Sequence, residues 1–220
     1  MQKFSISLFS VLTCLLAHAD ESSPWSYRVG VTSIVPKVTS GDLSAPSVSG
    51  STVDVSSATQ LAGGINYRIN DKWSVDMPLG LPFEHNMYGD GAISGVGKIS
   101  SAKALPATVL LQYQLPYDHP TIKPYAGAGL TYAYFFDAKG TTVLNALTGT
   151  SSSNPTTLTV ESKFASSIQL GSRFNMPGAW FIDMNVIKTF LKTSSKLSTG
   201  QTIDISLDPW VYSLSVGRSF

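Results

Sequence analysis

The chain ends with the segment WVYSLSVGRSF, from Trp210 to Phe220. Apolar residues alternate there with small or polar ones: the apolar set is Trp210, Tyr212, Leu214 and Val216, and the other set is Ser213, Ser215, Gly217 and Ser219. Successive side chains of a strand point to opposite faces, whereas those of a helix do not. The segment therefore predicts a β-strand with one apolar face.

Similar β-rich segments recur along the chain, separated by Gly, Ser, Thr, Asn and Pro, and helix signals are scarce. We predict eight strands: Trp25 to Val35, Thr59 to Ile69, Trp73 to Leu81, Ala104 to Leu115, Pro124 to Phe136, Lys163 to Phe174, Trp180 to Leu191, and Ile205 to Phe220. The alternation alone also suits a soluble antiparallel sheet with one buried face.

The connections between these strands alternate in length. Those after the second, fourth and sixth strands are short, whereas the others are long, such as 36–58 and 138–162. Outer-membrane barrels have an even number of strands, short periplasmic turns and long extracellular loops. The sequence therefore predicts an all-β fold, an eight-stranded antiparallel transmembrane β-barrel with both termini on the periplasmic side.

Aromatic residues gather at the ends of the predicted strands. They are Trp25, Trp73, Tyr125, Phe135, Phe136, Trp180 and Trp210. Aromatic side chains are enriched where a membrane meets water, so we expect these residues to form two interfacial girdles. The terminal Phe220 after an alternating strand is also common in bacterial outer-membrane barrels, where the barrel assembly machinery recognises it.

Residues 1–19 predict a secretion signal. Lys3 supplies a positive start, residues 4–16 form a short apolar core, and Ala17-His18-Ala19 has the small-x-small pattern of a cleavage site. We therefore expect a mature barrel domain over residues 20–220. A lipoprotein processed at Cys14 is a weaker alternative, because Thr13 precedes the cysteine and the apolar core continues beyond it.

Composition excludes several classes of function. The formal net charge is +1 and charged residues make up only 13% of the chain, so we expect no nucleic-acid partner. Beyond the predicted signal the chain has no cysteine and two histidines, His85 and His119, which we expect in loops or turns. No spacing indicates a metal site, and no serine has a His and acid framework. We expect no enzyme activity, metal or cofactor.

Short motifs spread from the first predicted strand to the last carry a family resemblance. They include Leu105-Pro106-Ala107-Thr108, the run from Pro124 to Leu130, Pro82-Phe83 followed by His85, Gln169-Leu170-Gly171, and Leu207-Asp208-Pro209-Trp210-Val211. Together these segments resemble the outer membrane protein W family over essentially the whole mature chain. The resemblance implies a narrow, largely hydrophobic channel for small hydrophobic molecules in the Gram-negative outer membrane, with lateral release through the wall as one route.

The resemblance also implies two gate positions. One is aromatic and falls at Phe164, and the other is aliphatic in the family but falls here at Pro78, next to Leu79. Proline cannot donate a ladder hydrogen bond, so Pro78 could loosen the wall. Structural explanations stay open for both: Pro78 could mark a strand end or bulge, and Phe164 could face lipid.

Five charged residues fall on the predicted inward faces: Arg28, Arg68, Asp76, Arg173 and Asp183. We expect interior ion pairs among them that hold the barrel, with a role in transport as the alternative. An eight-stranded barrel is nearly filled by its side chains or holds one small ligand, which argues against a bulk porin.

Two other functions stay open. One is a non-conducting structural or adhesive barrel, and the other is a soluble lipocalin-like periplasmic carrier whose apolar faces point inward. Expected partners of the leading function are outer-membrane lipids, the barrel assembly machinery and a small hydrophobic ligand. The sequence does not fix the oligomeric state.

Overall fold

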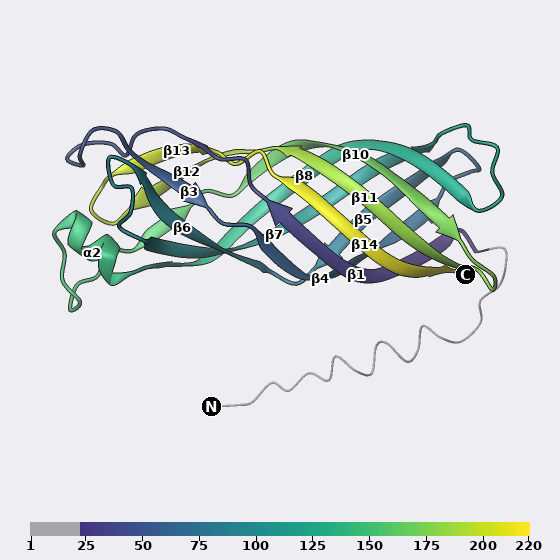
Figure 1. Ribbon diagram of the computed structural model, residues 1–220, viewed down its shortest axis with the longest axis horizontal. Coiled ribbons are helices and arrows are strands. Elements are labelled where there is room, and N and C mark those ends of the chain that lie inside the picture. The colour runs from purple at the N-terminus through teal and green to yellow at the C-terminus, as the bar shows by residue number, and fades with distance from the viewer. Residues whose placement is uncertain (1–22) are drawn as a thin grey trace, which may run out of the picture.

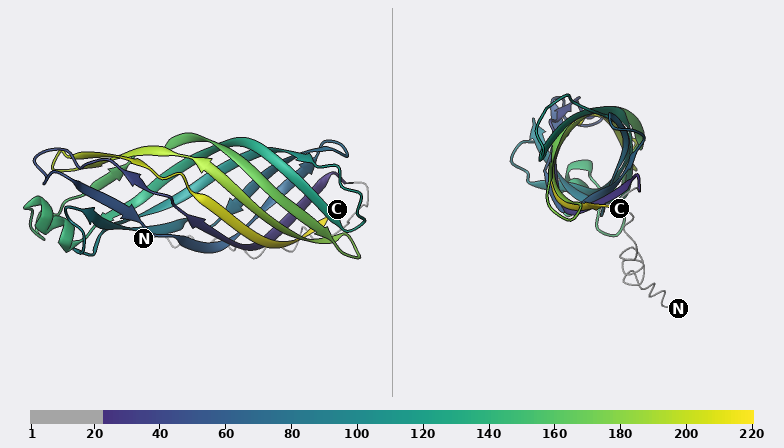
Figure 2. Two further views of the ribbon diagram at one scale, coloured as in Figure 1. Left: turned by 45° about the horizontal axis from the view of Figure 1, so that its top comes forward. Right: turned by 90° about the vertical axis from the view of Figure 1, so that its right-hand side faces the viewer.

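Eight antiparallel strands close into a ring in the computed structural model, which describes residues 23–220 (Figure 1). In chain order they are β1 (Trp25–Val35), β4 (Ala58–Arg68), β5 (Trp73–Gly80), β7 (Lys98–Gln114), β8 (Ile122–Gly140), β10 (Lys163–Asn175), β11 (Trp180–Phe190) and β14 (Trp210–Ser219). Each pairs with its neighbours in sequence, and β14 pairs with β1. The predicted barrel is confirmed, and the view along its axis in Figure 2 shows the closed ring. The predicted signal, 1–19, lies outside the described residues.

The short turns after β4, β7 and β10 lie at the end that holds the C-terminus, on the right in Figure 1. The opposite, extracellular end is longer than predicted because the connections expected to be loops contain further elements. These are β2 (Thr39–Ser40), β3 (Ser51–Val55), β6 (Phe83–Gly91), α2 (Thr142–Thr148), β9 (Leu158–Val160), β12 (Lys192–Leu197) and β13 (Thr202–Ser206). Within residues 23–220, no helix is long and apolar enough to cross a membrane.

The predicted last strand, 205–220, is interrupted. Residues 202–206 form β13, which pairs with β12, and β14 begins only at Trp210. Asp208 between them has a φ of 35°, in the left-handed region, and Pro209 follows it. This break lets β13 leave the membrane wall and join the extracellular extension.

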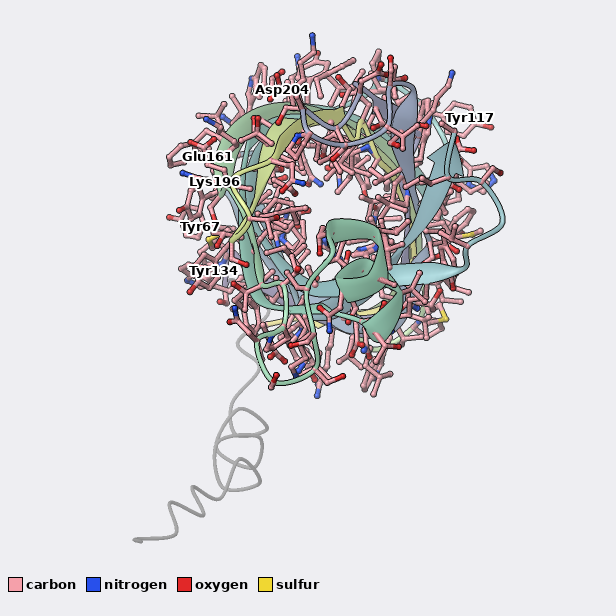
Figure 3. All side chains as sticks on the ribbon, turned by 90° about the vertical axis from the view of Figure 1, so that its left-hand side faces the viewer. Tyr67, Tyr117, Tyr134, Glu161, Lys196 and Asp204 are labelled. Atoms are coloured by element: carbon pink, nitrogen blue, oxygen red, sulfur yellow. The ribbon has the colours of Figure 1, made fainter. Side chains whose placement is uncertain are left out.

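The outer face of the barrel is apolar. Val29 on β1 is 68% exposed, and Leu61, Leu130, Leu170 and Leu214 on four other strands are also exposed. In a soluble carrier these side chains would point inward, so the lipocalin-like alternative is wrong. Figure 3 looks into the extracellular end and shows the labelled Tyr67 and Tyr134 projecting away from the lumen.

The girdle prediction needs a correction at two positions. Trp25, Trp73, Trp180 and Trp210 are exposed on the outside, as expected. Tyr125, in contrast, is buried inside the barrel, and Phe135 lines its interior. Alternate residues of a strand face the same side. Tyr125 and Phe135 are odd-numbered residues of β8, as is the buried Ala133, so both point inward.

Two glycines of β8 differ in how closely a neighbouring strand approaches them. A Cβ at Gly129 would overlap the backbone carbonyl oxygen of Val109 on β7, which cannot move without breaking the ladder. A Cβ at Gly127 would meet nothing nearer than the Gln169 side-chain oxygen at 3.1 Å. Of these two positions, only residue 129 must be glycine for β7 and β8 to pack this closely.

We predict that Gly129→Ala destabilises the barrel by about 3 kcal/mol, because the added methyl forces β7 and β8 apart. Gly127→Ala is the matched control, two residues away on the same strand, and should have a much smaller effect. The measurement is the urea midpoint of each variant refolded in lipid vesicles. Equal midpoints for the two variants would contradict the close-packing explanation.

Candidate functional site

A buried ion pair lies at the centre of the barrel. The Arg28 guanidinium donates from Nη1 to Asp76 Oδ1 at 2.6 Å and from Nη2 to Asp76 Oδ2 at 2.9 Å. The two side chains come from β1 and β5, which flank β4, and Gly64 on β4 leaves room between them: a Cβ there would lie 2.9 Å from Arg28 Nη2. Two parallel hydrogen bonds fix the pair in one geometry.

Asp183 on β11 is a second carboxylate near Arg28. Its Oδ1 is 4.0 Å from Arg28 Nε, and the Tyr125 hydroxyl donates to Oδ1 at 3.1 Å and to Oδ2 at 2.9 Å. The Asn185 amide donates to Oδ1 at 2.7 Å. Both carboxylates are therefore held by several donors, which is what a buried charge requires.

Amides continue this network across the barrel. Gln169 Nε2 donates to Asp76 Oδ2 at 3.5 Å, Gln112 Nε2 donates to Gln169 Oε1 at 2.8 Å, and Asn66 Nδ2 donates to Gln112 Oε1 at 2.9 Å. We call this set the polar plug, and it consists of Arg28, Asn66, Asp76, Gln112, Tyr125, Gln169, Asp183 and Asn185. It joins seven of the eight wall strands, all except β14, across the interior of the barrel.

The other two predicted interior charges form no ion pair among the described residues. The guanidinium of Arg173 lies over the ring of Phe181, 4.1 Å from its centroid. Arg68 is exposed at the periplasmic rim. Both line a small polar recess below the plug. For these two residues the expected interior ion pairs are not formed: Arg173 lies opposite Asp183 in the register of β10 and β11 but packs over Phe181 instead, and Arg68 is at the exposed end of β4.

A chain of hydroxyl groups lies above the plug. Thr108 bonds to Thr131 at 2.9 Å, Thr131 to Ser167 at 2.7 Å, and Ser167 to Thr189 at 2.9 Å. The four residues come from four consecutive strands of the ring, β7, β8, β10 and β11. Three of them, Thr108, Thr131 and Thr189, line the cavity above, as do Arg28 and Asn185 of the polar plug. The hydroxyl chain and the plug therefore form the floor of that cavity together.

Above this floor lies an apolar cavity, which together with the solvent space at its openings contains about 1280 Å³ free of protein atoms. We call it the barrel cavity. Its wall is mainly aliphatic and aromatic, and includes Ile34, Phe83, Met87, Ala104, Ala133, Phe135, Ile187, Leu191, Ile205 and Leu207. A cavity lined in this way, with few polar groups, fits a small apolar molecule.

His85 is one of the few polar groups of the cavity wall. It lies on β6, outside the apolar band, and not in a loop as expected, because β6 was itself missed. Burial lowers the pKa of His85 from its ordinary value of 6.5. The neutral ring donates from Nδ1 to the Ser56 carbonyl oxygen at 2.7 Å, so His85 fastens the 56–57 turn to the wall.

The wall of the barrel has a gap in its ladder between β5 and β7. Pairing runs from Trp73 with Tyr113 to Asp76 with Leu110 and then stops. Gln114 N–H donates to the Lys72 carbonyl and Leu81 N–H donates to the Leu61 carbonyl of β4. Even-numbered residues of β5 and β7 therefore direct their backbone groups toward each other, because donors alternate between sides along a strand.

Proline explains why the ladder stops there. Continuing the register places Pro78 opposite Thr108 and Gly80 opposite Pro106, so each of the next hydrogen-bonded pairs contains a residue without an N–H group. Pro78, Leu79, Gly80, Pro106 and Thr108 all line the barrel cavity, which therefore reaches the wall at this gap.

The two predicted gate positions differ in their placement. Pro78 and Leu79 lie at the gap, and Leu79 is 54% exposed while also lining the cavity. Phe164 points outward, is 75% exposed and packs against Tyr132 with ring centroids 4.7 Å apart. The Phe164 ring therefore lies on the lipid-facing surface and does not line the barrel cavity.

Sequence reasoning missed several residues of this site. Tyr125 was assigned to a girdle, Gln169 was named only within a family motif, and Gln112 and Asn66 were not singled out. Their signal was parity: each shares an inward face with other polar residues of its strand, such as Thr108 with Gln112. Pro106 appeared only as part of a motif, because its effect depends on the strand that faces it.

Residues 24–220 match the model of the OmpW family. The chain belongs to this family. It is 28% identical to the dibenzothiophene metabolism operon protein PahQ of Pseudomonas aeruginosa over 100% of both chains. It is 26% identical to outer membrane protein W of Vibrio cholerae, covering 98% of this chain and 97% of the relative.

Among solved structures, the crystal structure of the outer membrane protein OprG from Pseudomonas aeruginosa is similar, with a TM-score of 0.78 and 27% identity over 89% of this chain and 95% of that chain. Members of the OmpW family are barrels of the Gram-negative outer membrane and not enzymes. This OmpW-family chain is therefore an outer-membrane barrel protein in contact with membrane lipids.

We predict that Asp76→Asn lowers the free energy of unfolding by about 3 kcal/mol, because it leaves the buried Arg28 without its main counter-charge. The matched control is Asp137→Asn, which removes an exposed carboxylate paired with Lys103 at 2.8 Å and Lys139 at 2.9 Å and should leave stability unchanged. Urea unfolding in lipid vesicles measures both. Similar effects of the two variants would show that the buried pair is no more important than a surface one.

Proposed function

We propose that this OmpW-family chain is an outer-membrane channel that takes small hydrophobic molecules from outside and releases them sideways through the wall between β5 and β7. The observation that carries this proposal is the barrel cavity: it is apolar, it is closed below by charged and amide groups, and it meets the wall where the ladder is broken.

A straight path to the periplasm is unfavourable for an apolar molecule. It would have to break the bidentate pair of Arg28 with Asp76 and the hydrogen bonds of Gln112 and Gln169, and leave those groups unpaired. Unpaired buried charges and amides are costly. The hydrocarbon of the membrane, in contrast, is as apolar as the cavity, so exit through the gap requires no such loss.

The known relatives support an apolar solute without identifying it. PahQ is described as a protein of a dibenzothiophene metabolism operon, and dibenzothiophene is a flat aromatic molecule with no charged group. A molecule of this class matches a cavity wall of Ile, Leu, Ala and Phe side chains. For this chain, small uncharged apolar molecules are accordingly the proposed substrate class.

The test restores the missing donors at the gap with the double variant Pro78→Val, Pro106→Val. Each ladder hydrogen bond stabilises the closed wall by about 1 kcal/mol, so we expect entry of an apolar solute to fall by about tenfold or more. The measurement is the uptake of N-phenyl-1-naphthylamine by cells that express each variant, because their lipopolysaccharide leaflet is itself a barrier to apolar solutes.

Pro209→Val is the control, because Pro209 lines the same cavity away from the gap. It should leave uptake at the level of the unmodified chain. If the unmodified chain raises uptake no more than cells without it, the chain is a non-conducting structural barrel. If the double variant takes up the probe at full rate, release does not pass through the gap.

We also propose that Phe220 is the signal by which the barrel assembly machinery recognises this chain. Its backbone N–H donates to the Trp25 carbonyl at 3.1 Å and its ring lies 5.3 Å from that of Tyr27, so it marks the seam where β14 meets β1. Deletion of Phe220 should lower the amount of folded barrel in the outer membrane severalfold, measured by gel mobility before and after boiling.

Phe164→Ala is the control for loss of an aromatic ring, because Phe164 is also exposed to lipid but lies far from the seam in sequence. It should assemble to the normal level. Equal losses for the two variants would mean that an exposed aromatic residue matters only for stability in the membrane.

A further inference from the structure

A second apolar cavity lies beyond the barrel cavity, inside the extracellular extension. It contains about 720 Å³ of empty space, and we call it the outer cavity. Its wall comes from β3, β6, β7, α2, β9, β12, β13 and the segment between β2 and β3, and includes Leu43, Val53, Ile99, Leu144, Leu158, Leu197 and Ile203. Figure 3 looks into this end of the barrel and shows α2 lying across part of its mouth.

The two cavities meet at three residues. Met87 on β6, Ser195 on β12 and Ile205 on β13 line both of them. All three are buried, and Met87 also belongs to an apolar cluster with Ile99, Leu144 and Leu158, which line the outer cavity. The two cavities therefore adjoin at the side chains of Met87, Ser195 and Ile205, and we call this place the constriction.

Met87 is suited to movement. The pairing of β6 with β7 shifts in register between Met87 and Tyr88, and the extra residue is Ile99 of β7, because Met87 pairs with Ser100 and Tyr88 with Lys98. The ladder is therefore interrupted locally beside Met87. The methionine side chain is unbranched and has three rotatable bonds, so it can change shape at low cost inside an apolar cluster.

We propose that Met87 is a movable gate between the outer cavity and the barrel cavity, and that apolar solutes entering from outside must displace it. This inference rests on the proposed function, since it names the step before the solute reaches the gap between β5 and β7. It assigns the outer cavity as the capture site for the same class of small uncharged apolar molecules.

The gate can be tested without any apolar solute. Thr193→Cys places a thiol in the barrel cavity only, below the constriction. The sole cysteine, Cys14, lies in the predicted signal, so this thiol reports alone in the mature chain. The probe is sulfonatoethyl methanethiosulfonate, added outside intact cells. Its charge keeps it out of the membrane, so it cannot reach residue 193 through the gap in the wall.

Met87→Ala in the Thr193→Cys background should raise the rate of thiol modification severalfold, and Met87→Phe should lower it. Ile99→Ala is the matched control: it truncates an equally buried member of the same cluster that lines the outer cavity only. It should leave the rate unchanged. Gel mobility before and after boiling identifies the variants that fold.

The proposal is overturned if Met87→Ala leaves the rate unchanged, or if Ile99→Ala raises it equally, since the latter would indicate general loosening of the cluster. Ser194→Cys, on the opposite face of β12, should react at the same rate in every background. If cells that express the chain fail to take up N-phenyl-1-naphthylamine, the proposed function is wrong. If only the rate of thiol modification is insensitive to residue 87, the proposed gate alone is wrong.

Discussion

In the hydrocarbon of a membrane there is no water to bond with exposed peptide groups, and this constraint determines the whole wall. The ladder is therefore closed, with β14 paired to β1 along most of its length. Closure in turn directs every second side chain into a narrow lumen and the others into lipid. Inside the lumen, charged side chains can be buried and paired. Between β5 and β7 the pairing stops after Asp76 and Leu110, whereas β7 and β8 show a shift in register between Ser101 and Lys103 and then stay paired.

The polar plug shows how such a lumen tolerates charge. One guanidinium and two carboxylates are buried together, which leaves a net negative charge. Hydrogen bonds that Tyr125, Asn185 and Gln169 donate to the carboxylate oxygens stabilise this charge. A buried ion pair contributes little net stability compared with apolar packing, because both ions lose their hydration. Its more evident consequence is selectivity: it makes the periplasmic half of the lumen unsuitable for apolar molecules and leaves the extracellular half free for them.

The sequence predicted the eight wall strands because their alternation of apolar and polar residues follows from two well-separated environments, lipid and lumen. It also placed Arg28, Asp76 and Asp183 on inward faces from parity alone. The extracellular strands were not predicted because Ser- and Thr-rich segments such as 192–197 have no strong pattern, and form strands only when paired with neighbours. Arg68 and Phe164 were ambiguous for another reason: parity gives a face, but not the height along the barrel or the partner within reach.

Proline at the gap has a second consequence beyond ending the ladder. Any opening in a lipid-facing wall leaves N–H groups unpaired, and each is costly in an apolar medium. At the facing edges of β5 and β7, Pro78 and Pro106 remove the donors that would otherwise be orphaned, so that the remaining ones belong to Gly80 and Thr108. A gap built from proline is therefore less unfavourable than the same gap built from other residues. This makes a permanent interruption of the ladder compatible with a stable barrel.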